Sequence, residues 1–144
     1  MAYLKVGKLD QAISHHEALA KVSPKDVVII NNLAGLYDRS GDKRAFEYAK
    51  RAYDLAPNQP QTIDTYGWML VRRGNVQQGL RLLRNAQARS NNQPDVGYHI
   101  AVALDKLGRQ QEALREIEAV FAVGKHFKDE KDARKLLERL KQKK

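Results

Sequence analysis

Apolar residues recur along this chain at three- and four-residue intervals, the spacing of amphipathic α-helices that bury one face. The clearest example covers residues 60–93, where two such segments are separated by a turn at Arg73-Gly74-Asn75. The apolar positions of the first segment are Ile63, Tyr66, Gly67 and Leu70, and those of the second are Gly79, Leu80, Leu83 and Ala86. This pattern predicts a pair of helices joined by a short turn.

The same unit recurs before and after this stretch. Turn glycines stand at Gly7, Gly41, Gly74 and Gly108, at spacings of 34, 33 and 34 residues. A second series of small residues follows at Ala12, Ala45, Gly79 and Ala113, at spacings of 33, 34 and 34 residues. Self-similarity at this period, built from helix pairs, is typical of a helical repeat array. We therefore expect an all-α fold in which each pair covers an apolar face of its neighbour.

The turns also predict where each unit begins and ends. Whole units cover residues 27–59, 60–93 and 94–124, and Pro60 and Pro94 each fit a first helical turn, where no backbone N–H is needed. Residues 1–26 predict a truncated unit, in which the end of a first helix stops at Gly7 and a second helix covers residues 9–22. The apolar stripe of that second helix consists of Leu9, Ala12, Ile13, Leu19 and Val22. An array that starts within a unit suggests a fragment of a longer protein.

Residues 125–144 depart from the repeat pattern and predict a basic capping helix and tail. A helix from Asp129 to about Gln142 would place its apolar residues on one face, with charge elsewhere. Those residues are Ala133, Leu136, Leu137 and Leu140. A single amphipathic helix after the last repeat would cover the exposed end of the array.

The small residues and their apolar neighbours resemble the tetratricopeptide repeat. That family's pattern appears as Leu33-Ala34-Tyr37 with Ala45-Ala49-Ala52-Pro57, as Tyr66-Gly67-Leu70 with Gly79-Leu83-Ala86, and as Ile100-Ala101-Leu104 with Ala113-Ile117-Val120. The resemblance covers residues 2 to about 124 and implies a right-handed α-solenoid. Two departures are Gly97, where a large residue is usual, and a first whole unit that is one residue short.

A narrower resemblance concerns the setting. The runs DTYGWMLVRRGN, GLRLLRNA and YHIAVALDKLGRQQEALREI are similar to the C-terminal repeats of bacterial lipoproteins from exopolysaccharide and PEP-CTERM/exosortase systems. This similarity implies a periplasmic or cell-envelope scaffold in polysaccharide export or protein sorting. A cytoplasmic location is the alternative, and the absence of cysteine fits either compartment.

The tetratricopeptide resemblance also implies a binding surface, because first helices line the concave side of such arrays and hold partner segments there. The groove candidates are Asn31, Asn32, Asp38, Arg39, Asp64, Trp68, Arg72, Tyr98, Asp105 and Lys106. Trp68 lies off the core stripe near Arg72, and both residue types are frequent binding anchors. The alternatives are that Trp68 packs under a neighbouring repeat and that Tyr98 makes an inter-repeat contact. The lysine–asparagine clamp with which some family members hold C-terminal carboxylates is absent.

The net charge of +9 supports a second hypothesis. Residues 125–144 hold nine Lys or Arg and four Asp or Glu, which is 9 − 4 = +5. This end could bind RNA, anionic lipid or acidic polysaccharide electrostatically, although we expect nucleic acid to be an unlikely partner. A third hypothesis is an architectural array that self-associates through its truncated N-terminal face at Met1 to Val6. No apolar run approaches the roughly 20 residues that a membrane span needs.

Sequence motifs for catalysis are missing. The chain contains no HExxH, phosphate-binding glycine loop or GxSxG motif. His15 and His16 point about 100° apart on a helix and cannot share one metal ion without distortion. We therefore expect no enzyme activity and no cofactor or metal. From the repeat resemblance we expect a protein or peptide segment as the partner.

Overall fold

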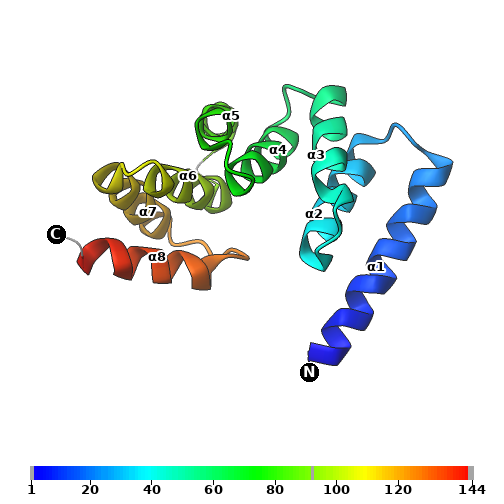
Figure 1. Ribbon diagram of the computed structural model, residues 1–144, viewed down its shortest axis with the longest axis horizontal. Coiled ribbons are helices and arrows are strands. Elements are labelled where there is room, and N and C mark those ends of the chain that lie inside the picture. The colour runs from blue at the N-terminus through cyan, green and yellow to red at the C-terminus, as the bar shows by residue number, and fades with distance from the viewer. Residues whose placement is uncertain (1, 92, 143–144) are drawn as a thin grey trace. The chain divides into compact units, whose positions relative to one another are not determined.

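The structure, a computed structural model, describes the backbone of residues 2–91 and 93–142 and the side chains from Gly7 onward (Figure 1). These residues form eight helices joined by short turns, so the predicted all-α repeat fold is confirmed. The helices are α1 (Ala2–Val22), α2 (Val27–Ser40), α3 (Arg44–Leu55), α4 (Pro60–Arg72), α5 (Val76–Arg89), α6 (Pro94–Lys106), α7 (Gln110–Val123) and α8 (Glu130–Gln142).

Turn glycines separate the helices within each pair. Gly41, Gly74 and Gly108 adopt left-handed backbone conformations, with φ values of 77°, 97° and 79°. A side chain is strained in this conformation, so glycine is the residue that suits these positions. After Gly41, the Asp42 carboxylate accepts a hydrogen bond from the Arg44 N–H at 2.9 Å and so helps the next helix to begin.

Gly7 does not behave like the other turn glycines. The prediction that a first helix stops there is wrong, because α1 continues through it from Ala2 to Val22. Glycine weakens a helix by about 1 kcal/mol but does not by itself end one. Lys8 follows Gly7 and offers no side-chain acceptor for a new helix start, in contrast to Asp42. The side chains of residues 1–6, on which the predicted self-association face depends, lie outside the described part.

The chain divides into two compact units, residues 1–66 and 67–144. In the first unit, α2 and α3 pack through small and large apolar residues that alternate along their facing sides. The buried residues of this pair are Ile30, Leu33, Ala34, Tyr37, Ala45, Ala49 and Ala52. The ring of Tyr66, on the first part of α4, lies near the rings of both Phe46 and Tyr53, at 5.7 and 5.1 Å between centroids.

In the second unit, glycines permit two close helix contacts. A Cβ added to Gly79 on α5 would lie 2.7 Å from the carbonyl oxygen of Gly67 on α4 and 2.6 Å from Val71 Cγ2. A Cβ on Gly97 of α6 would lie 2.5 Å from Val120 Cγ2 of α7. Gly97, which departs from the usual repeat pattern, therefore belongs to the packing of α6 against α7.

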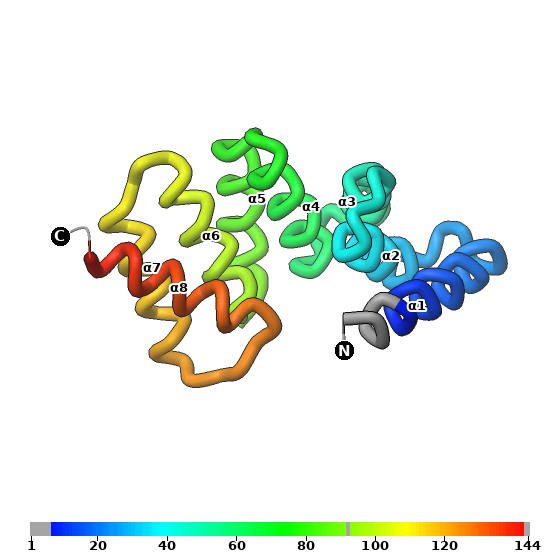
Figure 2. Tube along the Cα trace, turned by 60° about the horizontal axis from the view of Figure 1, so that its bottom comes forward, coloured from blue at the N-terminus to red at the C-terminus, as the bar shows by residue number. Residues whose placement is uncertain are grey.

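Helix α8 lies beside α7 in both views (Figures 1 and 2). The Ala133, Leu136 and Leu140 side chains are buried, as expected for a capping helix, while Leu137 is half-buried. Phe127, just before α8, lies 6.3 Å from Phe121 of α7 between ring centroids. The C-terminal helix is thus an integral part of the second unit.

Helix α1 packs beside α2 with less burial. Between Gly7 and Val22 the structure shows half-buried and exposed side chains and no fully buried one. Leu19 and Val22, predicted to belong to the apolar stripe, are exposed. This part of the prediction is wrong because the face turned to α2 contains Ile13, Glu17 and Ala20, and Leu19 and Val22 lie to one side of it.

Candidate functional site

Trp68 stands at the centre of an aromatic cluster on α4 and α6. Its ring stacks on the imidazole of His99, with 4.1 Å between centroids and 16° between planes, and it lies 5.9 Å from the Tyr98 ring. The guanidinium of Arg72, one turn along α4, lies 6.0 Å from the Trp68 ring centroid. Trp68 is half-buried and Arg72 is exposed, so one part of the cluster remains open to a partner.

The other side of this cluster is covered by the start of α8. His99 is 7% exposed, and its Nε2 lies 3.8 Å from Asp129 Oδ2. The side chain of His99, directed at this carboxylate, lowers the pKa of Asp129 below its usual range. Burial of Tyr98, with a further contribution from the negative charges of Asp132 and Asp129, raises the pKa of its hydroxyl to about 12. Tyr98 therefore makes contacts inside the chain and offers little surface to a partner in the groove.

Two other groove candidates lie at the end of α6. The half-buried Asp105 carboxylate accepts a hydrogen bond from the guanidinium of Arg139 on α8, forming an ion pair between the two helices. Asp105 is therefore already paired within the chain. The sequence pattern of α6 alone could not show this, because the partner lies on α8. Lys106 is exposed at the last turn.

In the first unit, the predicted groove residues lie on α2 and on the first turns of α4. Asn32 and Arg39 are exposed, whereas Asn31, Asp38 and Asp64 are half-buried. The Oδ1 atom of Asn31 is covered and accepts no hydrogen bond within the described part of the chain. A covered acceptor of this kind costs stability and is not positioned for an incoming peptide N–H, so Asn32 and Arg39 are the more accessible members of this set.

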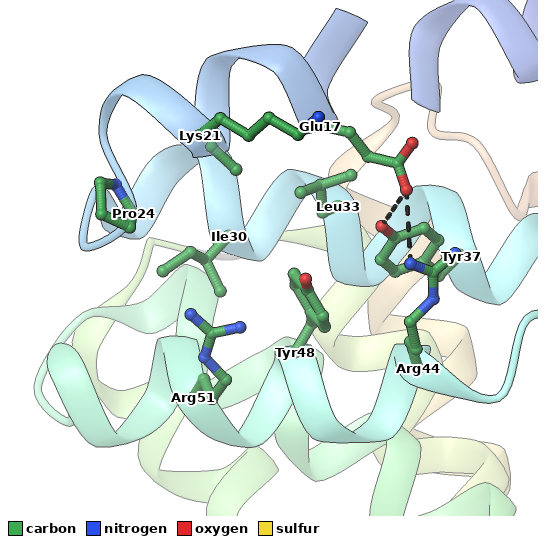
Figure 3. Close-up of a pocket in the computed structure, with 10 residues that line it drawn as sticks. Glu17, Lys21, Pro24, Ile30, Leu33, Tyr37, Arg44, Tyr48 and Arg51 are labelled. Atoms are coloured by element: carbon green, nitrogen blue, oxygen red, sulfur yellow. Dashed lines mark hydrogen bonds and ion pairs between the residues drawn. The ribbon is translucent and has the colours of Figure 1, made fainter. Parts of the chain in front are cut away.

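A second surface feature, which the sequence analysis missed, is a cleft of about 460 Å³ between α1 and α3 above α2 (Figure 3). This volume is within the range of about 300–1,000 Å³ that is common for ligand pockets. Its lining residues are Glu17, Ala20, Lys21, Pro24, Ile30, Leu33, Tyr37, Arg44, Tyr48 and Arg51. We call this feature the α1–α3 cleft.

The spacing of the lining residues could have indicated part of the α1–α3 cleft. Arg44, Tyr48 and Arg51 follow one another at i, i+4 and i+7, which places them on one face of a helix. Glu17, Ala20 and Lys21 lie on one face of α1 for the same reason. What the spacing could not reveal is that α1 and α3 stand apart above α2, because this depends on how α1 packs.

One end of the α1–α3 cleft is closed by a polar network (Figure 3). The Tyr37 hydroxyl donates to Glu17 Oε2 at 2.6 Å, and Arg44 Nη1 lies 3.4 Å from the same oxygen. Burial and the hydrogen bond to Glu17 raise the pKa of Tyr37 well above its usual value. The Arg44 guanidinium also lies 4.3 Å from the Tyr37 ring centroid and pairs with Asp42 at 2.8 Å.

The structure gives no positive indication of a metal site or a membrane span. Across the described residues, no cluster of three or more His, Asp or Glu side chains is arranged to hold a metal ion. Within the same part of the chain, no helix combines the length and apolar character that crossing a bilayer requires. The basic helix α8 uses Arg139 in its contact with α6 and places Arg134 Nη2 3.1 Å from Glu130 of the same helix.

Consecutive helix pairs of this length, joined at left-handed glycines and packed through small residues, define a helical repeat protein of the α-solenoid class. The sequence model of one family in this class, the tetratricopeptide repeat, matches residues 33–126. The chain belongs to the tetratricopeptide repeat family, whose members are protein-interaction scaffolds. A comparison with curated proteins gives no match.

Solved structures of several tetratricopeptide repeat proteins share this fold. A thermophilic repeat protein from Thermus thermophilus superposes with a TM-score of 0.76 at 19% identity, covering 96% of this chain and 76% of that one. PilW, a type IV pilus biogenesis factor, gives 0.74 at 20% identity, covering 86% of this chain and 58% of its own. A MamA structure gives 0.68 at 21% identity, covering 83% of this chain and 66% of its own. At these identities the similarity establishes the fold and leaves the partner open.

Proposed function

We propose that this chain is a non-enzymatic interaction scaffold that holds a segment of a partner protein on its first-helix surface. The observation that carries the proposal is the half-exposed Trp68 ring, fixed from behind by His99 and flanked by the exposed Arg72. A rigid aromatic side chain beside a guanidinium provides apolar area and charge-assisted hydrogen bonds at little entropic cost. Lys106 of the same unit adds a polar contact in this proposal, while Asn32 and Arg39 of the first unit stay predictions.

The covered side of the cluster limits the binding surface. Because Tyr98 and Asp105 are already used in contacts with α8, they contribute by positioning that helix. A repeat protein of the same fold, YrrB, is described as having an unusual peptide-binding site, which supports peptide recognition as a property of such chains. That structure superposes with a TM-score of 0.67 at 16% identity and covers 84% of this chain and 63% of its own.

The test is capture of partners by the purified chain from soluble and envelope extracts, with variants that separate the surfaces. Arg72→Ala removes an exposed side chain and Trp68→Ala removes the proposed anchor, and circular dichroism verifies that each variant keeps its helix content. Arg81→Ala, on the exposed side of α5, removes an equal charge elsewhere. We expect each of the first two variants to weaken capture by about tenfold or more, as for a binding hot spot, and Arg81→Ala to have no effect.

Equal loss with Arg81→Ala would show that general electrostatic attraction replaces specific recognition. A charge variant of α8, Lys131→Gln/Lys135→Gln, tests the basic-end hypothesis directly, because both residues are exposed on that helix. Capture that requires these two lysines and falls steeply with salt would favour the electrostatic alternative. The setting in exopolysaccharide or protein-sorting machinery stays a prediction from the narrower sequence resemblance, and the captured partner would decide it.

A further inference from the structure

The α1–α3 cleft has more positive than negative charge. Three of its lining residues are cationic, Lys21, Arg44 and Arg51, and one, Glu17, is anionic, which gives 3 − 1 = +2. Arg44 is neutralised by Asp42 and Glu17. Lys21 and Arg51 are exposed and have no carboxylate within ion-pair distance in the described part of the chain. These two cations are therefore available to an external anion.

The floor and walls of the cleft are apolar and aromatic. Ile30 and Leu33 of α2 lie at the bottom and are themselves 1% and 0% exposed, so the apolar surface open to an occupant comes from Ala20, Pro24 and Tyr48, which are half-buried or exposed. Figure 3 shows Tyr48 projecting into the middle of the cleft, with Arg51 toward one end and Arg44 toward the other. An occupant that fits this surface needs an apolar group that contacts Ala20, Pro24 and Tyr48, and a carboxylate within reach of Lys21 and Arg51.

We propose that the α1–α3 cleft is a second docking site, which binds a partner peptide segment in which an acidic residue stands next to a large apolar one. Alternating side chains of an extended peptide present these two chemistries a few ångströms apart. This site lies wholly within the first unit and on residues other than those of the Trp68 surface, so it extends the function proposed above.

The aromatic geometry favours a peptide over a nucleic acid. The Arg51 guanidinium lies 4.8 Å from the Tyr48 ring centroid, and the Arg44 guanidinium covers the Tyr37 ring. Tyr37 also meets Tyr48 edge to face, at 5.1 Å and 84°. Rings engaged in this way offer no free stacking platform for bases, which single-strand binding requires.

The experiment uses fluorescein-labelled octapeptides in which glutamate alternates with leucine and tyrosine. Matched peptides carry glutamine or lysine in place of glutamate, and a single-stranded oligonucleotide provides a fourth probe. Fluorescence anisotropy measures binding to the whole chain. We expect the glutamate peptide to bind, and its affinity to fall about tenfold or more in Lys21→Gln/Arg51→Gln, because charge-assisted hydrogen bonds are stronger than neutral ones.

A matched control separates local contacts from net charge. Lys8→Gln/Lys50→Gln removes two exposed cations from α1 and α3 that do not line the cleft. This control should retain the affinity of the original chain. Ala20→Trp, which fills the cleft without changing charge, should abolish binding, and Arg72→Ala should leave it unchanged. Circular dichroism verifies that each variant keeps its helix content.

Several outcomes would overturn the proposal. These are equal loss in the Lys8→Gln/Lys50→Gln control, equal binding of the glutamine or lysine peptide, or no glutamate-peptide binding at millimolar concentration. An oligonucleotide that binds more tightly and depends on Lys21 and Arg51 would assign the cleft to nucleic acid instead. Because Arg72→Ala tests the Trp68 surface separately, failure at either site is distinguishable from failure at the other.

Discussion

The helices nearest the two ends of the chain lie on their neighbours in different ways. Helix α8 buries Ala133, Leu136 and Leu140 and forms an ion pair with α6. Helix α1 has no fully buried side chain between Gly7 and Val22, and its Glu17 makes polar contacts with Tyr37 and Arg44. The terminal helix that buries large apolar side chains closes the surface beneath it, and a cleft remains beside the one whose contact face includes the charged Glu17 and the small Ala20.

The largest expected effect concerns the apolar contacts of these two helices. Leu140→Ala should lower the free energy of unfolding by about 2–4 kcal/mol, because Leu140 is 3% exposed and its truncation leaves a cavity. Ile13→Ala on α1 should cost less than about 1 kcal/mol, since this side chain is only half-buried. Urea unfolding of both variants measures the difference. Equal costs would show that α1 is packed as firmly as α8.

A second comparison concerns glycines within helices. Gly79→Ala should destabilise the chain by about 1–3 kcal/mol, because its Cβ would overlap Val71 and the Gly67 carbonyl oxygen. Gly35→Ala on α2 should stabilise it by up to about 1 kcal/mol, since no heavy atom stands within 4 Å of the added Cβ and alanine favours the helix. The same substitution thus has opposite signs, which thermal unfolding can measure. A loss of stability in Gly35→Ala would contradict the open packing of α2 at this position.

A smaller effect concerns the tyrosines beneath the terminal helices. The pKa of Tyr98 is raised to about 12, so folded Tyr98 keeps its proton where the unfolded chain, with a pKa of about 10, has lost it. This contribution to stability is complete below pH 10 and is lost as the pH rises toward 12. Asp132→Asn should lower the pKa of Tyr98, and Glu17→Gln should lower that of Tyr37.

Tyrosinate absorbance near 295 nm, compared with Tyr98→Phe and Tyr37→Phe, assigns each titration. If Asp132→Asn shifted neither tyrosine, α8 would not lie over α6 as described. If the two carboxylate substitutions shifted both tyrosines equally, the assignment of Glu17 to Tyr37 and of Asp132 to Tyr98 would be wrong.

The sequence predicted those features that depend on local chemistry. The repeat period predicted the helix pairs, and Gly41, Gly74 and Gly108 marked their turns because a left-handed residue is needed there. The apolar face at Ala133, Leu136 and Leu140 predicted the capping helix. Gly7 was misinterpreted because glycine permits a turn but does not require one.

The candidate site was less predictable, because exposure depends on contacts between helices far apart in sequence. Tyr98 and Asp105 fit a groove by spacing on α6, but residues about 30 positions later cover them. The residues of the α1–α3 cleft lay on recognisable helical faces, yet the distance between α1 and α3 depends on how the side of α1 with Glu17 and Ala20 packs on α2. Tertiary packing decided both outcomes.

The central claim is that α8 closes its surface while α1 leaves an open cleft. Amide hydrogen exchange on the intact chain tests it most directly, because protection reports local opening. We expect amides of residues 133–140 in α8 to be protected about tenfold or more above those of residues 13–20 in α1. Equal protection of the two segments, or stronger protection in α1, would contradict the account.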